Sequence, residues 1–359
     1  MRIIFKILLL IIALSSCNRK KQFACESATV DIYSEEISAY IDYEEIDIDY
    51  LFSFPEALLL DSNKLIIKEE HSKNKLFHVI DLSTGELLQE FAERGNAPNE
   101  YISSTLNVYY NSNTKELSFF DPNGKKYHNF IGDLNNNYRY NENINMNFSE
   151  SIREVVKSGD NYILTGENGT FDEYRFIVTD KNGNILYTNN KYPCLHSYLN
   201  GSKENLRQML YNSVFYKTSP DEKKLVFATY KGTLIQFIDI SEIPDSIGTI
   251  KSVLLDYPMK QEKNTKDAYE WVYGFEDIYT TDKHVYAIYN GKTIKENPML
   301  GQNILVYNWD GQLVNSYKTD LYIRCIAVDE KNNIAYVIAC KEESEFFLAK
   351  INLQKHSVY

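Results

Sequence analysis

The chain has 359 residues and a net charge of −12 with histidine neutral, and 14 % of its residues are aromatic. The acidic balance disfavours nucleic acid as a partner, because a negatively charged surface repels phosphate backbones. Fifteen glycines and eight prolines are too few for a low-complexity chain, and the length suits either two ordinary domains or one large all-β domain.

The amino terminus reads as an export signal. Residues 1–16 carry a basic start followed by the apolar run Ile7–Leu14, which is too short to cross a bilayer as a helix. The small residues before Cys17 resemble the lipobox of bacterial lipoproteins. That resemblance implies cleavage before Cys17, lipid attachment to its sulfur, and a membrane as partner through the anchor. We expect residues 17–27 to form the lipidated tether.

The residues after Cys17 bear on the compartment. Asn18 differs from the aspartate that retains some lipoproteins at the inner membrane, which favours the outer membrane. Arg19–Lys21 is basic, whereas surface-exported lipoproteins of Bacteroidetes usually carry acidic residues there. These features, read through the resemblance, predict an anchor in the outer membrane that faces the periplasm.

A hairpin unit then recurs along the chain. Each copy joins two short strands rich in β-branched and aromatic residues through a polar turn. Successive units are 47 to 62 residues apart, counted at the first turn of each: Asp61, Asn111, Gly159, Asp221, Asp282 and Asp329. Six units of that period with about four strands each predict an all-β, six-bladed β-propeller. One blade cannot bury both of its faces, and a ring of six leaves few open edges.

The last unit shows only three clear strands after Leu321. Propellers commonly close by pairing the two chain ends within one blade. We therefore expect Ala28–Tyr33 or Ile46–Leu51 to supply the fourth antiparallel strand, within a single domain that spans residues 28–359.

Three segments resemble a known family, the TolB-like six-bladed propeller lipoproteins of Bacteroidetes. Glu93–Tyr101 looks like the family's crossing between blades. Thr218–Phe227 is similar to the Ser-Pro-Asp-Gly-Lys-Lys hairpin of many propellers, with Glu222 where glycine is usual. Gly274–Val328 is the closest match. The resemblance implies a fold and transfers almost no function, because the fold hosts many activities.

No catalytic constellation is visible in the sequence. A Gly-x-Ser-x-Gly elbow is absent, and no two of the six histidines are spaced as a metal pair. We therefore predict no metal and no cofactor. Aspartates that end strands are read as turn residues rather than calcium ligands; they are Asp81, Asp121, Asp180, Asp239 and Asp310. Carboxylate pairs for glycoside hydrolysis stay open, because such partners lie far apart in a chain.

Two insertions account for the long spacings between units. In 196–216, residues 203–212 have the pattern of a short helix. In 256–275, a charged loop precedes alternating aromatic residues. The candidate ligand contacts are Tyr269, Trp271 and Tyr273 from that second insertion, with Arg94 and Asn99 from the crossing. The alternation also fits a plain strand packed between blades, and the crossing also fits a purely structural turn.

Of the remaining cysteines, Cys325 and Cys340 lie on opposite arms of one predicted hairpin. They are read as two buried free thiols, with a disulfide as the alternative.

These observations predict a non-enzymatic, lipid-anchored binding or scaffold module of the cell envelope, for a protein, peptide or glycan. The alternative is an envelope polysaccharide hydrolase or lyase built on a propeller. Carboxylates converging with histidine or arginine in a deep pocket would favour the enzyme. A channel plugged by tyrosine and phenylalanine would favour the scaffold.

Overall fold

A computed structural model describes most of the chain. The described residues are 24–30, 39–71, 74–133, 137–146, 151–166, 174–194, 211, 213–255, 259–261, 269–293, 295–296, 300–342 and 345–353. Within these ranges no helix has the length and apolar character needed to cross a membrane. The predicted signal peptide and Cys17 lie outside them, as does nearly all of the predicted helix at 203–212.

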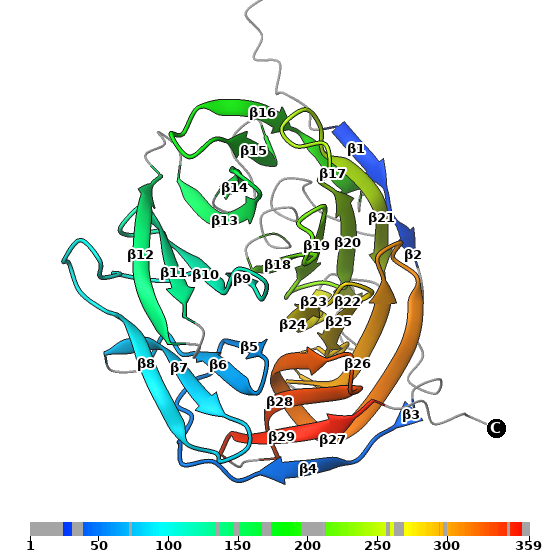
Figure 1. Cartoon of the computed structure of the whole chain (residues 1–359). Helices are drawn as coiled ribbons and strands as arrows, with labels where there is room; N and C mark the ends of the chain where they lie inside the picture. Colours follow the sequence, from blue (N-terminus) through cyan, green and yellow to red (C-terminus); the bar gives the residue numbers. More distant parts are fainter. Residues whose placement is uncertain are drawn as a thin grey trace, which may run out of the picture.

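The described strands form a ring of antiparallel blades around a central axis (Figure 1). Blades one to three are four-stranded sheets, each with its first strand innermost. Their strands are β5 (Ala57–Asp61), β6 (Lys64–Lys68), β7 (Lys75–Asp81) and β8 (Leu87–Glu93); β9 (Val108–Asn111), β10 (Glu116–Asp121), β11 (Lys126–Gly132) and β12 (Tyr138–Asn145); and β13 (Ile152–Ser158), β14 (Asn161–Gly166), β15 (Phe176–Thr179) and β16 (Ile185–Asn189).

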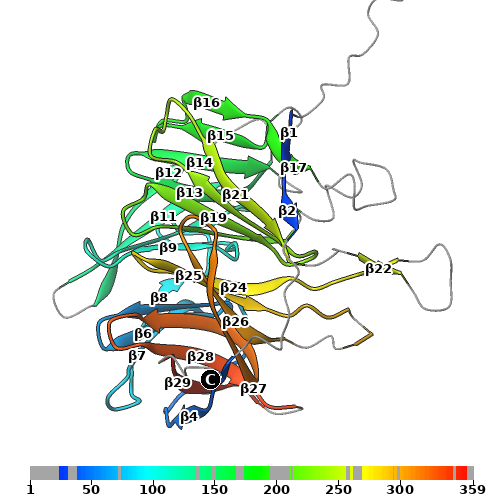
Figure 2. The same cartoon turned by 90° about the vertical axis from the view of Figure 1, so that its right-hand side faces the viewer.

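Blade four has the same plan, and a hairpin separates it from blade five. Its strands are β18 (Val214–Thr218), β19 (Lys224–Thr229), β20 (Leu234–Asp239) and β21 (Gly248–Leu254), and the hairpin is β22 (Met259–Gln261) with β23 (Tyr269–Trp271). Blade five continues with β24 (Phe275–Thr280), β25 (His284–Tyr289) and β26 (Gly301–Asn308). In side view the β22–β23 hairpin projects away from the disc (Figure 2).

One long strand belongs to two blades. The first half of β27 (Leu313–Asp329) pairs with β26 as the outer strand of blade five, and its second half pairs with β28 (Ile334–Cys340) as the inner strand of blade six. Strands β28 and β29 (Phe347–Asn352) continue that blade. The eight-stranded sheet is therefore two blades joined by one continuous strand, and the ring has six blades.

The N-terminal segment closes the ring. Strand β4 (Tyr43–Ile46) pairs antiparallel with β29 as the outermost strand of blade six, so that both chain ends meet in one blade. The closing strand thus ends at Ile46, where one of the two predicted segments begins. The other predicted segment lies elsewhere: Thr29–Val30 forms β2, which pairs parallel with β21 of blade four.

The same segment follows the rim before it reaches blade six. Strand β1 (Ala24–Ser27) pairs parallel with β17 (Lys191–Cys194), and β3 (Ala39–Tyr40) pairs parallel with the first half of β27. The last four residues of the predicted tether are therefore a strand. Together β1, β2, β3 and β4 form a strap along the outer edges of the second half of the ring (Figure 1).

The core is divided among the blade interfaces. Six buried apolar clusters each join two neighbouring blades, and the sixth joins blade six to blade one. In β6, Ile66 packs towards blade two, while Leu65 and Ile67 pack towards blade six. Because side chains alternate across a strand and both faces are covered, second strands such as β6, β19, β25 and β28 contain continuous apolar runs.

Four of the five aspartates at strand ends accept backbone N–H groups in their turns, as predicted. The turn at Asp310 is held instead by Asn308, whose amide oxygen accepts the N–H groups of Asp310 (3.1 Å) and Gln312 (2.9 Å). The Asp81 carboxylate accepts the backbone N–H groups of Ser83 (2.8 Å) and Thr84 (3.2 Å), and Asp180 does the same for Asn182 and Asn184. Such Asx bonds hold a turn closed without a cation.

Glu222, at the usual glycine position of its hairpin, has a left-handed backbone with φ of 58°. A non-glycine residue there is strained. Its carboxylate accepts hydrogen bonds from Tyr109, Asn111 (3.2 Å) and the backbone N–H of Gly159, and these bonds join blades two, three and four.

Candidate functional site

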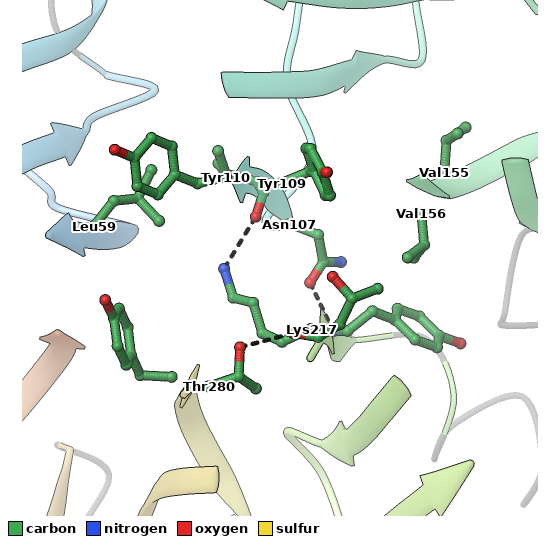
Figure 3. A pocket seen from close by; sticks show the side chains of 12 residues that line it. Leu59, Asn107, Tyr109, Tyr110, Val155, Val156, Lys217 and Thr280 are labelled. Carbon is green, nitrogen blue, oxygen red and sulfur yellow. Dashed lines mark hydrogen bonds between the residues drawn. The ribbon is translucent and has the colours of Figure 1, made fainter. Parts of the chain in front are cut away.

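In the described part of the chain, side chains from the inner strands of five blades meet around the central axis. A cavity of about 70 Å³ remains on the axis, lined by tyrosine, valine, leucine, asparagine and threonine, with Lys217 as its charged residue (Figure 3). Pockets for drug-sized ligands are roughly 300–1,000 Å³. The cavity therefore has room for water or a small ion and none for a sugar ring.

The inner strands expose backbone edges to this channel, and polar side chains satisfy them. Asn107 of blade two accepts the N–H of Tyr216 in blade four (2.7 Å), and the Lys217 amine donates to the carbonyl of Val108 (3.3 Å). The Thr280 hydroxyl donates to the carbonyl of Thr218 (2.8 Å) (Figure 3). These bonds join inner strands of different blades, so among the described residues hydrogen bonds and tyrosine rings plug the axis.

Charged residues cluster where inner strands begin. We call this side of the disc the entry face. Glu154, Glu276 and Asp277 are each 2–3 % exposed, and burial raises the pKa of these carboxyl groups to about 7, about 7 and about 6. Lys68, 1 % exposed, pairs with Glu56 and donates to the carbonyl of Thr105 (2.7 Å).

Asp277 links two blades. Its carboxylate accepts the N–H of Ile278 in its own strand (2.8 Å) and the N–H of Ile326 in blade six (3.0 Å). Burial lowers the pKa of Lys217, and the charge of Asp277 partly offsets that effect. The lysine lies deep in the channel but lines the cavity, so part of its surface stays accessible to water. These contacts assign Asp277 to holding blades together.

A group of aromatic and charged residues lies on one side of the entry face, where blades four, five and six meet the segment before blade one. We call it the entry-mouth cluster: Phe54, Tyr230, Tyr273, Glu276 and Arg324. The Arg324 guanidinium lies 4.5 Å from the centroid of the Phe54 ring, which is 40 % exposed. The rings of Tyr230 and Tyr273 are 5.2 Å apart. The carboxylate of Glu276 lies 4.0 Å from Arg324 and accepts from Asn290 (3.2 Å).

Backbone hydrogen bonds hold the segment that contains Tyr273 between blades four and five. Gly274 donates to the carbonyl of Tyr230 (2.7 Å) and Gly232 donates to that of Val272 (2.7 Å). A Cβ on Gly274 would lie 1.9 Å from the carbonyl oxygen of Gly232, so only glycine fits there. This approach brings the two tyrosine rings together.

The predicted contact residues do not form one site. Trp271 is half-buried against the core between blades three and four, while Tyr273 joins the entry-mouth cluster. Tyr269 lies in β23, and its side chain is outside the described residues. Arg94 and Asn99 are exposed on the crossing from blade one to blade two. Arg94 bonds to Glu70, whose neighbour His71 lies 5.6 Å from the Phe54 ring, centroid to centroid.

Contacts within the crossing hold its shape. Arg94 donates to Glu70 (2.9 Å), and its guanidinium lies 5.5 Å from the centroid of the Tyr101 ring, which is 1 % exposed. Glu100 accepts the N–H of Ala97 (2.8 Å) and lies against Gly95. The arginine is therefore partly occupied within its own loop.

Sequence reasoning missed the buried charges, although a signal was present. Arg324 interrupts an apolar run, and Glu154 and the neighbouring pair Glu276 and Asp277 directly precede apolar residues near the start of an inner strand. A charge in that position is costly unless it is paired or hydrogen-bonded, which marks the place where neighbouring blades meet.

Cys325 and Cys340 are free and buried, as predicted. Burial raises the pKa of both thiols, well above its usual value for Cys325, so neither is a reactive thiolate.

Comparison with known proteins supports the fold. A family model described as TolB-like 6-blade propeller-like matches residues 34–331. A Bacteroides fragilis protein, named as a candidate exported protein, is 12 % identical with a TM-score of 0.53, over 93 % of this chain and 99 % of that one. At this identity the likeness shows the fold alone.

Two further solved structures are more distant. The β-propeller domain of Myceliophteria thermophila Cps50 (Swd1) is 9 % identical with a TM-score of 0.49, over 86 % of both chains. A Lactobacillus plantarum protein is also 9 % identical, with a TM-score of 0.46, over 85 % of this chain and 86 % of that one. No curated protein matches the chain.

Proposed function

The chain belongs to the TolB-like six-bladed propeller family, and we propose that it is a non-enzymatic binding module that engages a protein or peptide partner through its entry face. The plugged axis carries this proposal. The cavity is about 70 Å³, and no carboxylate lines it. A propeller that has filled its channel with structural bonds presents its faces for recognition instead.

The entry-mouth cluster has the composition of a protein-binding surface. Tyrosine and arginine dominate the few residues that carry most of the binding energy in protein interfaces. Tyr230, Tyr273 and Phe54 supply rigid rings at a small conformational cost, and Arg324 supplies a planar cation. The β22–β23 hairpin projects from the same face, because it leads directly into β24 (Figure 2).

The cell envelope is the proposed location. The sequence before Cys17 and the name of the Bacteroides fragilis neighbour both support export. Lipid attachment at Cys17, an outer-membrane anchor and a periplasmic orientation belong to the same proposal. A Cys17→Ala chain that still partitions into membranes would contradict the lipid anchor.

One observation favours the rival, a polysaccharide hydrolase or lyase. Burial raises the pKa of Glu276 to about 7 beside Arg324, a state in which a carboxylic acid can donate a proton near neutral pH. The side chain is only 3 % exposed and already accepts from Asn290, which leaves it little access to a substrate. Glycan binding without cleavage stays within the proposed module, with the two tyrosine rings as its platform.

The proposal is tested by cross-linked affinity capture of the tagged chain from its native envelope, followed by mass spectrometry. We expect one recurrent partner at near-equal amount, and at least about a tenfold loss of it with Phe54→Ala plus Tyr273→Ala. Lys283→Ala plus Lys331→Ala, on exposed turns of the opposite face, is the matched control. If both double variants captured the partner equally well, binding through the entry face would be refuted. If glycan co-purified and no protein did, glycan binding would be favoured over protein binding.

A further inference from the structure

The strap fixes where the anchored end of the chain leaves the propeller. Its first described strand, β1, pairs with β17 directly after the outer strand of blade three, with Ala24 opposite Lys191. In both views β1 lies at the rim beside β16 and β17 (Figures 1 and 2). The described part of the chain therefore begins at the rim of blade three.

Covalent geometry limits how far the anchor reaches from there. Six residues lie between Cys17 and Ala24, and the seven Cα-to-Cα steps from one to the other span at most roughly 25 Å when fully extended. A lipid on Cys17 consequently holds the rim of blade three close to the bilayer.

An exposed apolar pair lies on that rim. Ile185 and Leu186 begin β16 and are 57 % and 44 % exposed. Ile185 is six residues before Lys191, so it lies within roughly 20 Å of the point where the strap begins. Exposed Lys181, in the turn before β16, adds a cation that suits anionic headgroups.

We propose that the rim of blade three, at Ile185 and Leu186, docks on the surface of the membrane. This docking rests on the lipid anchor proposed above. It adds an apolar contact of the protein to the contact that the anchor makes with the bilayer. The disc then stands on its edge, and its entry face is turned sideways to a partner rather than covered by lipid.

Exposed apolar residues alone do not establish such a site, because single ones are normal on protein surfaces. The equivalent position of blade one, Leu87–Leu88, is also exposed, at 36 % and 44 %. It lies on a different part of the ring, away from the start of the strap (Figure 1). What distinguishes blade three is the anchor beside it, and blade one therefore supplies a matched control.

The test uses the full lipidated chain reconstituted in vesicles that contain anionic lipid. Leu186→Cys and Leu88→Cys, whose parent side chains are both 44 % exposed, each receive one environment-sensitive fluorophore. Quenching by lipids that carry nitroxide groups near the headgroup is then measured, with the labelled parent chain as background. We expect quenching at position 186 to be about threefold stronger than at position 88.

Flotation of the vesicles separates the two proposals. Chains that float with the vesicles but quench equally at both positions would overturn rim docking and leave the anchor intact. Chains that fail to float would overturn the anchor and the docking together. A further variant, Ile185→Ser plus Leu186→Ser, should lower the quenching of a label on neighbouring Asn184→Cys, and unchanged quenching there would count against the apolar contact.

Discussion

Asp277 shows at the level of single residues how this propeller handles buried charge. It bonds to backbone N–H groups of two blades and lies near Lys217. When one partner of a buried polar network is removed, the remaining groups stay buried without a hydrogen bond. The stability lost in this way exceeds the stability that the intact network contributes.

We therefore expect Asp277→Ala to lower the free energy of unfolding by about 3 kcal/mol, because the N–H of Ile326 and the charge of Lys217 lose their partner. Asp277→Asn keeps one acceptor and removes a buried charge, so its loss should be about 1 kcal/mol. Urea unfolding of both variants gives the measurement.

A double-mutant cycle with Lys217→Met isolates the contribution of the ion pair. If the lysine is the main partner, the loss in Asp277→Ala should shrink by at least about 1 kcal/mol in the Lys217→Met background. A full loss in both backgrounds would assign the role of Asp277 to the Ile326 N–H alone.

At this scale the sequence predicted turns well and contacts poorly. Asp81 and Asp180 were readable because an Asx turn is made within a few residues. The entry-mouth cluster was not, apart from Tyr273, because Phe54 and Arg324 are 270 positions apart in the chain and meet only when the ring closes.

At the scale of elements, ring closure depends on β4 and the strap. Strand β29 would otherwise present an open edge, and Ile41, which is 2 % exposed, belongs to the core between blades five and six. An unpaired edge is a site for pairing with other chains.

A chain that starts at residue 47 should therefore aggregate or unfold at a Tm lower by at least about 10 °C, because it loses β3, β4 and Ile41. A chain that starts at residue 31 loses only β1 and β2 and should retain the ring, with a much smaller decrease. Calorimetry and light scattering of the two truncations give the comparison. Equal stability of both would show that the ring holds without its closing strand.

The sequence correctly predicted that an N-terminal strand closes the ring, but it gave the wrong residues for that strand. The three-stranded look of the last unit correctly demanded an N-terminal strand, but β4 (Tyr-Glu-Glu-Ile) carries no alternating apolar pattern of its own. Its place is decided by the free edge of β29, which is a tertiary cause. The continuous strand β27 could not be predicted either, because no turn in the sequence separates its half in blade five from its half in blade six.

For the whole molecule, six interfaces with six cores make the blade count readable from the repeat alone. The surface loops are different. Insertion lengths point to a loop-rich face, but which residues on it contact a partner depends on side chains brought in from several blades.

The buried acids predict an unusual dependence of whole-molecule stability on pH. Glu154, Glu276 and Asp277 have folded-state pKa values of about 7, 7 and 6, above their ordinary values of 4.5, 4.5 and 3.8. The folded chain therefore holds more protons than the unfolded chain between about pH 4.5 and 7, and the free energy of unfolding must fall as pH rises through that window.

Burial of His78 acts in the opposite direction. Its pKa is lowered from 6.5, so the unfolded chain binds the extra proton and stability rises with pH below 6.5. Asp121, with a pKa of about 2, loses its stabilising effect only when the pH falls below its ordinary 3.8. Three carboxyl groups with raised pKa values outweigh the one histidine with a lowered pKa. We therefore expect the free energy of unfolding, and with it the Tm, to fall from pH 5 to pH 7.5.

Glu276→Gln should flatten part of that slope, because glutamine is neutral at every pH and keeps an oxygen for the Asn290 amide. The difference in free energy of unfolding between the variant and the parent should shift in favour of the variant by about 1–3 kcal/mol from pH 5 to pH 7.5. This is the size that the raised pKa of one carboxyl group implies. Asp180→Asn, at an exposed turn, is the control and should leave the slope unchanged. A parent chain whose Tm rises steadily from pH 5 to 7.5 would mean that these acids are ionised in the folded state, with Arg324 and Lys217 as full counter-charges.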